Sequence, residues 1–416
     1  MKFRLIYRFL LDTKIRFYLA FFEVKSLTSF LRRHNLKKLR WGLIGGGEGS
    51  QVGFAHRAAA QLDGRFSFVA GALDVDPQAA REFGVSLGLE VARSYGSWQD
   101  MLGTEKNVKG EERIGLVTIA TPNSTHFQIT KAFLEAGFNV LCEKPLTMTV
   151  EEARELVLIA KASNRICAVN YGYTGYPLVR QMRSMVLGGE LGEIRLVVAE
   201  FAGGFMADSA DAENSRVKWR FSSQHSGMAA ITVDCGIHAL NMACFVTNKK
   251  VVEVSSDFAS GIKNRELEDD NSSAFRLESG IIGRLWTSGL AIGRTHGLTI
   301  QVFGEKGGLS WKQEQPDQLS WTPLNKPTNI LERGHPDLHL SAQRANRITI
   351  GHPEGMVFAF ANIYQDLSEV ILAQAEGKKP SNLALDYPTV EDGCHSIEIV
   401  EAMTRSVANK SCWTKV

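Results

Sequence analysis

Buried strands alternate with helices in the first part of the chain. Five apolar runs are each flanked by a stretch with the spacing of an amphipathic helix, and these runs lie at residues 39–44, 62–73, 113–120, 138–142 and 165–170. Continuous apolar strands separated by helices are typical of a parallel sheet that is covered on both faces. The pattern therefore predicts an α/β domain with a doubly wound parallel sheet over residues 39–171.

The pattern changes after residue 171. A helix over 176–187 precedes short alternating strands, predicted at residues 193–201, 250–259, 273–277, 281–288, 297–303 and 308–313. Turn residues at 278–280 and 304–307 join neighbouring strands as hairpins, which indicates a mostly antiparallel sheet. We assign residues 172–416 to a second, α+β domain, with two closing helices and long surface loops at 208–216 and 322–347. The open face of such a sheet often serves as a subunit interface, so we expect a homo-dimer or homo-tetramer.

The first 38 residues form an extension in which basic residues mix with aromatic and aliphatic ones. Its uncharged stretches are too short for a bilayer-spanning helix, and it has no clear signal-peptide core. Three interpretations stay open: a basic amphipathic surface helix, a targeting presequence, or translated sequence upstream of the true start, the last of which would be an appendage unrelated to the chemistry. We favour the appendage, and membrane contact, if there is any, is expected only through this segment.

A glycine-rich turn follows the first strand. Gly45, Gly46, Gly47, Gly49 and Gly53 lie between the strand and a helix, an arrangement that brings backbone N–H groups to a pyrophosphate. The strict G-x-G-x-x-G spacing fails because Ser50 stands where the third glycine belongs. We therefore assign that role to Gly53, which makes the loop three residues longer than usual.

An acidic residue closes the second strand. Asp74 lies where the fingerprint places a carboxylate on the adenosine ribose hydroxyls, and Asp76 before Pro77 is a candidate helix N-cap. A carboxylate would repel a 2′-phosphate, so NAD is favoured over NADP. The nearby Arg81 leaves NADP open.

Two further strand ends carry polar residues. Thr121, Pro122 and Asn123, followed by His126, come after the third strand, and Glu143 with Lys144 comes after the fourth. The carboxyl ends of parallel strands meet at one edge, where ligands of such sheets bind. We predict that these residues bind the cofactor together with the glycine loop. His126 also fits a simpler role at the start of a helix.

Charge and cysteine usage exclude other classes of protein. Residues 1–40 contain 11 Lys and Arg against two acidic residues, so the overall charge of +2 leaves the remainder at −7. An acidic body lacks the clustered cations that nucleic acids require. The six cysteines form no C-x-x-C pair, which argues for a reducing, cytoplasmic location and against structural zinc. No third ligand stands near the His and Asp pair described next, so we expect no metal.

The chain resembles the Gfo/Idh/MocA oxidoreductases, the family of glucose–fructose oxidoreductase and inositol 2-dehydrogenase. The resemblance covers residues 39–416 and rests on the glycine loop, Thr121–Pro122–Asn123, Glu143–Lys144–Pro145, and the pair Asp234 and His238. It implies a Rossmann domain, a second domain with a large open sheet, and an NAD(P)-dependent dehydrogenase that acts on a sugar, polyol or similar secondary alcohol. The longer glycine loop and Cys235 depart from the family pattern.

The residue types supply the chemistry of alcohol oxidation. His238 is our candidate base, because the pKa of an imidazole lies near the working pH. Asp234, four residues earlier, shares its helix face and can orient it, while Lys144 can stabilise the developing carbonyl oxygen. Tyr173, Tyr176 and Arg220 are candidate substrate contacts, although tyrosines after a strand often belong to the core. An Asp-x-x-x-His pair is also a common capped helix start.

Two rival functions fit the same resemblance. A redox-assisted glycoside-cleaving enzyme would oxidise a sugar only transiently and would not consume NAD in net turnover. A non-catalytic nucleotide-sensing regulator would keep the glycine loop and lose the reacting residues. The presence of Lys144, Asp234 and His238 argues against the regulator.

Overall fold

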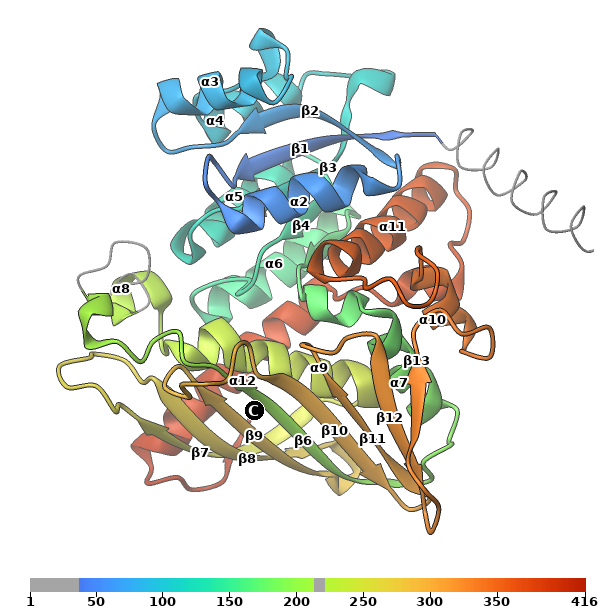
Figure 1. Ribbon diagram of the computed structural model, residues 1–416. Coiled ribbons are helices and arrows are strands. Elements are labelled where there is room, and N and C mark those ends of the chain that lie inside the picture. The colour runs from blue at the N-terminus through green and yellow to red at the C-terminus, as the bar shows by residue number, and fades with distance from the viewer. Residues whose placement is uncertain (1–36, 213–220) are drawn as a thin grey trace, which may run out of the picture.

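The computed structural model describes residues 37–212 and 221–416. It contains two sheets with helices between them (Figure 1). The predicted extension over residues 1–38 lies outside the described residues except for Lys37 and Lys38. The same holds for Arg220, one of the predicted substrate contacts.

The first sheet has five parallel strands in the order β2-β1-β3-β4-β5. They are β1 (Leu39–Gly45), β2 (Phe66–Ala72), β3 (Ile114–Ala120), β4 (Val140–Cys142) and β5 (Cys167–Val169). The parallel sheet is confirmed, and each strand lies within or beside its predicted run. The strands are nearly all buried, because helices cover both faces.

Helices follow the strands of this sheet. They are α2 (Gln51–Leu62), α3 (Pro77–Ser86), α4 (Trp98–Glu105), α5 (His126–Glu135) and α6 (Val150–Ser163). Ser50 caps α2, since its side chain accepts the N–H of Gly53. Asp76 caps α3 by accepting the N–H of Ala79, as predicted. Ser50 therefore has a structural reason to replace the glycine of the strict fingerprint.

The second sheet has nine strands in the order β13-β12-β11-β10-β6-β9-β8-β7-β14. They are β6 (Ile194–Ala202), β7 (Val251–Ala259), β8 (Asp270–Leu277), β9 (Ile282–Ser288), β10 (Leu298–Gly304), β11 (Gly307–Lys312), β12 (Gln318–Pro323), β13 (Asn329–Glu332) and β14 (Thr414–Lys415). All its pairs are antiparallel except β6 with β9.

One prediction for the second part was wrong. Residues 322–347 do not form a long surface loop, because β13 and α10 (Leu340–Ala345) lie there and β12 ends there. The strands form because Leu319, which is fully buried, pairs with Trp311 and adds a hairpin to the sheet edge. The predicted hairpins at 278–280 and 304–307 are confirmed, since they join β8 to β9 and β10 to β11.

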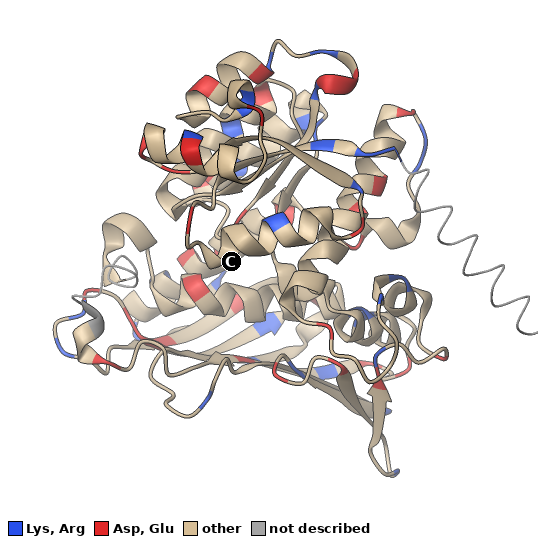
Figure 2. Cartoon of the chain, turned by 45° about the horizontal axis from the view of Figure 1, so that its top comes forward, with Lys and Arg blue, Asp and Glu red and all other residues tan. Residues whose placement is uncertain are grey.

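Helices cover one face of the second sheet. α7 (Pro177–Leu187), α9 (Ile237–Thr247) and part of α12 (Val390–Ala408) share a core with the inward side chains of its strands. The other face carries half-exposed residues such as Val198, Glu200 and Trp286. Lys and Arg are interspersed with Asp and Glu around both parts of the molecule (Figure 2).

The last two helices return to the first sheet. α11 (Met356–Ala375) packs on α2, and its Phe360 and Tyr364 lie in the core that contains Trp41 of β1. α12 packs on α6 and β5. By length and composition α11 is the one described helix that could cross a membrane, but more than half of it is buried in this core. The two parts are therefore joined by helices that belong to the end of the chain.

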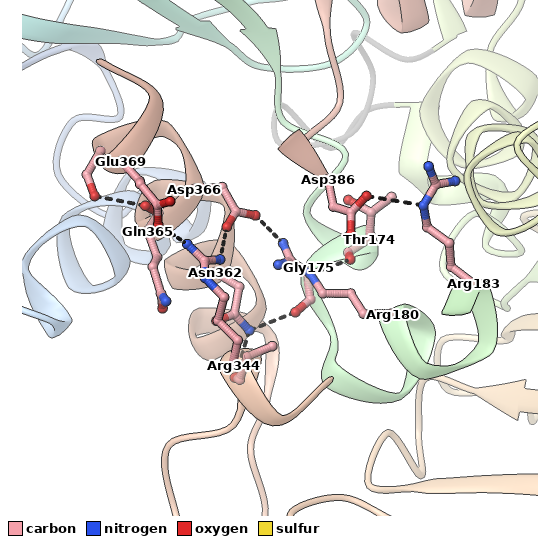
Figure 3. Close-up of polar contacts among 12 residues, drawn as sticks. Thr174, Gly175, Arg180, Arg183, Arg344, Asn362, Gln365, Asp366, Glu369 and Asp386 are labelled. Carbon is pink, nitrogen blue, oxygen red and sulfur yellow. Dashed lines mark hydrogen bonds and ion pairs between the residues drawn. The ribbon is translucent and has the colours of Figure 1, made fainter. Parts of the chain in front are cut away.

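Buried ion pairs strengthen the junction between α7, α10 and α11 (Figure 3). Asp366 of α11 accepts from Arg180 of α7 at 2.5 Å and also from Arg344 of α10, and Arg180 and Asp366 are both fully buried. Asn362 donates to the carbonyl of Gly175, before α7, at 2.8 Å. Breaking a buried, hydrogen-bonded pair by removing one partner costs about 3–5 kcal/mol, so this network fixes where α11 lies.

Candidate active site

A cavity of about 430 Å³ lies at the carboxyl ends of β1, β2 and β3. It brings together Gly45, Gly46, Asp74, Thr121 and Pro122, five of the predicted cofactor residues. Loop residues before and at the start of α4, among them Ser97 and Trp98, form its remaining wall. The position at the strand ends is the one that a dinucleotide takes in a doubly wound sheet.

The glycine loop has the backbone that its sequence requires. Gly45, Gly46 and Gly49 have positive φ angles of 76°, 67° and 75°. Gly53 lies so close to the strand that a Cβ atom there would stand 2.2 Å from the carbonyl oxygen of Gly46. This tight contact between helix and loop is the role of the third glycine of the fingerprint, as assigned from the sequence.

Asp74 lies at the rim of the cavity. Its carboxylate is exposed and accepts the N–H of Asp76 at 3.0 Å, which fixes its orientation. A Cβ atom on Gly47 would stand 3.0 Å from the second carboxylate oxygen, so Gly47 and Asp74 adjoin. The loop amides, the carboxylate and the cavity fit a dinucleotide with its pyrophosphate at the loop and a ribose at Asp74.

His126 is fully buried and does not face the cavity. Its Nδ1 lies 2.6 Å from the carbonyl oxygen of Pro145 and its Nε2 lies 2.9 Å from that of Thr121. Burial lowers its pKa, but Cys142 and the two carbonyls more than offset this and raise the pKa to about 9. Both ring nitrogens therefore join two loops, which fits the simpler role at the start of a helix, and the predicted contact of His126 with the cofactor stays a prediction. Asn123 lies in the first of these loops, in a 3₁₀ turn over Asn123–Thr125.

Glu143 is also buried and turned into the protein. One carboxylate oxygen, Oε1, lies 2.9 Å from Nε2 of His56 and 2.5 Å from Nδ2 of Asn170. The other accepts the main-chain N–H of Lys144 at 3.1 Å. Burial raises the pKa of Glu143, but His56, Asn170 and Lys144 together lower it to about 2. Both oxygens of this carboxylate thus have partners within the protein, and the predicted cofactor contact stays a prediction.

Lys144 reaches across to the second part of the molecule. Its Nζ donates to Oδ1 and to the main-chain oxygen of Asp234, both at 2.7 Å. Both side chains are about one-sixth exposed, so solvent reaches the pair at the junction between the two parts of the molecule. Two of the three predicted catalytic residues are thus in direct contact.

A π-helical turn over Thr232–Gly236 holds Asp234 immediately before α9. Glu268 fixes the start of this turn, since its carboxylate accepts the N–H groups of Ala230 and Thr232 at 2.9–3.0 Å. The sequence carries no signal for this role of Glu268, because the residue lies in the loop before β8, 36 residues after Thr232.

His238 lies in the first turn of α9 within an aromatic cluster. Tyr173 stands edge-on to it with 4.7 Å between ring centroids, and Tyr171 lies at 5.7 Å. Burial lowers the pKa of His238 well below its ordinary value, and the Lys144 ammonium lowers it further. Within the described residues its Nδ1 has no hydrogen-bond partner, and the orientation of the imidazole by Asp234 stays a prediction.

The two tyrosines predicted to contact substrate lie in different surroundings. Tyr173 belongs to the His238 cluster and its hydroxyl lies 3.1 Å from Nε2 of His296. Tyr176 is 1% exposed and packs on Trp311 in the core of the second part, so we assign it a packing role instead. His296, which also stacks on Phe201, was missed because a lone histidine in a loop between strands carries no sequence signal.

Within residues 37–212 and 221–416, no group of three His, Cys, Asp or Glu side chains could hold a metal ion. The predicted catalytic residues supply instead an ammonium, a carboxylate and an imidazole of lowered pKa. This set can take up a proton and stabilise a negative oxygen.

Comparisons with known proteins extend this picture. Residues 39–171 match the model of the Gfo/Idh/MocA oxidoreductase family with an NAD-binding Rossmann fold, and residues 179–310 match a C-terminal domain of the same family. The uncharacterized oxidoreductase YfiI of Bacillus subtilis is 35% identical over 385 residues, 91% of this chain and 97% of that protein.

Solved structures agree with the sequence matches. An inositol dehydrogenase homolog from Azotobacter vinelandii, complexed with NAD⁺, is 38% identical with a TM-score of 0.86, covering 91% of this chain and 97% of that chain. The same homolog with NADH and myo-inositol gives a TM-score of 0.83 at 38% identity, with coverage of 91% and 98%. Levoglucosan dehydrogenase from Pseudarthrobacter phenanthrenivorans is 27% identical, with 68% of this chain and 76% of that protein covered.

Proposed function

This chain belongs to the Gfo/Idh/MocA family of NAD-binding oxidoreductases, and we propose that it oxidises a secondary hydroxyl of a cyclic polyol or sugar. The contact between Lys144 and Asp234 carries this proposal. It joins the strand end beside the dinucleotide cavity to the turn that leads into His238. This contact supports the proposal that Lys144, Asp234 and His238 act together, with His238 four residues after Asp234.

The chain's own residues have distinct tasks in this reaction. His238, held neutral by its lowered pKa, accepts the hydroxyl proton. The Lys144 ammonium, held by Asp234, stabilises the oxygen as negative charge develops on it. Bound NAD would supply the acceptor for the two electrons and the hydrogen on carbon. The glycine loop, Asp74, Thr121 and Pro122 would hold it.

A ring-shaped polyol is the substrate class that the residues around His238 favour. Tyr173 and His296, both half-buried, pack together beside His238, and the C–H side of a sugar or cyclitol ring packs well on aromatic faces. The A. vinelandii homolog, at 38% identity, was solved with myo-inositol. Levoglucosan dehydrogenase, a more distant relative, is named for an anhydrosugar.

A substrate panel tests the proposal. The purified protein is mixed with NAD or NADP and with inositols, aldoses, anhydrosugars or sugar acids, and absorbance at 340 nm is followed. We expect net NADH formation on at least one cyclitol or pyranose. Product without net NADH, from a glycoside, would establish the glycoside-cleaving alternative. Nucleotide binding without turnover on any compound would establish the regulator.

We further propose that the half-exposed face of the nine-stranded sheet joins subunits into a dimer or tetramer. A hollow on this face is lined by serines, Glu200, Asp257, Arg284 and Trp286. Aromatic residues are enriched at subunit contacts, and Trp286 with the exposed Phe303 lies on this face. Light scattering on Trp286→Glu against wild type tests this, since a charge there would separate the subunits. We also propose a cytoplasmic location, on the cysteine spacing.

A further inference from the structure

Five buried side chains form a continuous hydrogen-bonded chain that ends in the loop after β4, which contains Lys144. Trp41 Nε1 lies 2.9 Å from Thr118 Oγ1, which lies 2.9 Å from the Tyr364 hydroxyl. That hydroxyl lies 2.8 Å from Nδ1 of His56, whose Nε2 lies 2.9 Å from Glu143. Each of the five is at most 8% exposed. The chain crosses β1, β3, α11 and α2 before it reaches the residue next to Lys144.

The two ends of the chain determine its direction. An indole N–H can only donate, and an ionised carboxylate can only accept. With a neutral imidazole, every link is satisfied when Trp41 donates to Thr118, Thr118 to Tyr364, Tyr364 to Nδ1 of His56, and His56 Nε2–H to Glu143. His56 is then fixed as the tautomer with its proton on Nε2, and each donor strengthens the next.

The buried carboxylate of Glu143 accepts hydrogen bonds from three donors. His56 and Asn170 bind Oε1, and the Lys144 amide binds Oε2. A buried carboxylate is costly unless it is fully hydrogen-bonded, so each donor matters for keeping it ionised. The carboxylate in turn fixes the main chain at Lys144, whose side chain reaches Asp234.

We propose that His56 and Tyr364 are positioning residues for Lys144, which act by holding Glu143 ionised and oriented on the Lys144 amide. The inference deepens the proposed function and rests on it, because it concerns the same catalytic lysine. Tyr364 comes from α11, which the buried Arg180–Asp366 pair locks in place. A residue from the last third of the sequence thus helps to fix the loop after β4, which lies in the first half of the sequence.

Two substitutions at His56 separate positioning from packing. His56→Leu removes both ring nitrogens, so Glu143 loses its imidazole donor and its pKa rises. We expect kcat to fall about tenfold or more and the acid limb of the pH–rate profile to move to higher pH. His56→Gln keeps an amide donor for Glu143 and an acceptor for Tyr364, so it should recover most of the lost turnover and return the acid limb toward wild type.

Two tyrosine variants test whether the loss of any buried hydroxyl group is enough to lower kcat. Tyr364→Phe breaks the chain, and Tyr95→Phe removes another buried phenol that donates to a carboxylate, that of Glu105 at 2.9 Å. Both should lower the melting temperature, but only Tyr364→Phe should lower kcat. If His56→Leu fails to fold, the isosteric Glu143→Gln tests the same point through its kcat and acid limb.

A readout without substrate separates this proposal from the proposed function. Ring-nitrogen NMR of protein labelled at its ten histidines, assigned with His56→Gln, reports the tautomer of His56. A proton on Nε2 supports the chain even if no substrate is found, and a proton on Nδ1 alone overturns it. A folded His56→Leu or Glu143→Gln protein with wild-type kcat and acid limb overturns the positioning role.

Discussion

The ammonium nitrogen of Lys144 lies 2.7 Å from Oδ1 of Asp234, although 90 residues separate them in sequence. Lys144 follows a strand of the first sheet, and Asp234 precedes the helix that covers the second. This ion pair therefore links the loop after β4, beside the dinucleotide cavity, to the turn that leads into His238.

Removing the ammonium should stop catalysis without unfolding the protein. We expect Lys144→Ala to lower kcat by about 10²- to 10³-fold, the usual cost of losing one donor to a developing oxyanion. Lys131→Ala is the matched control. It breaks an ion pair of 2.6 Å with Glu155 that joins α5 to α6, away from Asp234. Steady-state kinetics and circular dichroism measure both. Retained kcat in Lys144→Ala would remove this residue from the catalytic set.

The pH–rate profile should report His238. Because burial and Lys144 hold its pKa well below 6.5, the neutral base persists as the pH falls, and kcat/KM should lose activity only at a pH clearly lower than 6.5. His238→Ala should lower kcat and abolish that acid limb. The initial-rate profile from pH 4 to 9 measures this. An unchanged profile in the variant would exclude His238 as the base.

His126 should make stability depend on alkaline pH. Its folded pKa of about 9 exceeds the ordinary value of 6.5, so its contribution is complete below pH 6.5 and is lost as the pH rises through 9. The shift corresponds to on the order of 3 kcal/mol. Urea unfolding of wild type and His126→Asn from pH 6 to 10 should give curves that converge at the alkaline end. A difference in the free energy of unfolding between the two proteins that does not change with pH would contradict the raised pKa of His126.

Asp74 should select NAD against NADP. We expect Asp74→Ser to raise kcat/KM for NADP relative to NAD by about tenfold or more, because the carboxylate no longer repels a 2′-phosphate. Asp76→Ser is the control, since serine keeps the cap of α3 while a nearby charge is lost. Coenzyme titrations on the preferred substrate measure both. An unaltered NAD-to-NADP ratio in Asp74→Ser would place the ribose elsewhere.

Local signals in the sequence were enough for the first sheet. The apolar runs, the glycines and the caps depend on residues a few positions apart, and the glycine loop, Asp74 and Thr121–Asn123 meet because parallel strand ends share an edge. That Lys144 acts together with Asp234 and His238 was inferred from family resemblance, since periodicity cannot relate two domains, and the structure shows the contact between Lys144 and Asp234.

Long-range hydrogen bonds account for what was missed. Glu143 and His126 were expected to face the cofactor, yet their partners are His56, Asn170 and two carbonyl groups inside the protein. Which way a polar side chain turns at a strand end depends on such partners, and no spacing rule encodes them. Tyr364, 308 residues after His56, is the extreme case.

The return of α11 to the first sheet limits how the enzyme can move. A hinge that swung the sheets apart would have to pull Phe360 and Tyr364 out of the core around Trp41 and expose Arg180 with Asp366. Entry of substrate and exchange of the nucleotide must then rely on small rearrangements of surface segments, with the frame of the molecule staying rigid through each turnover.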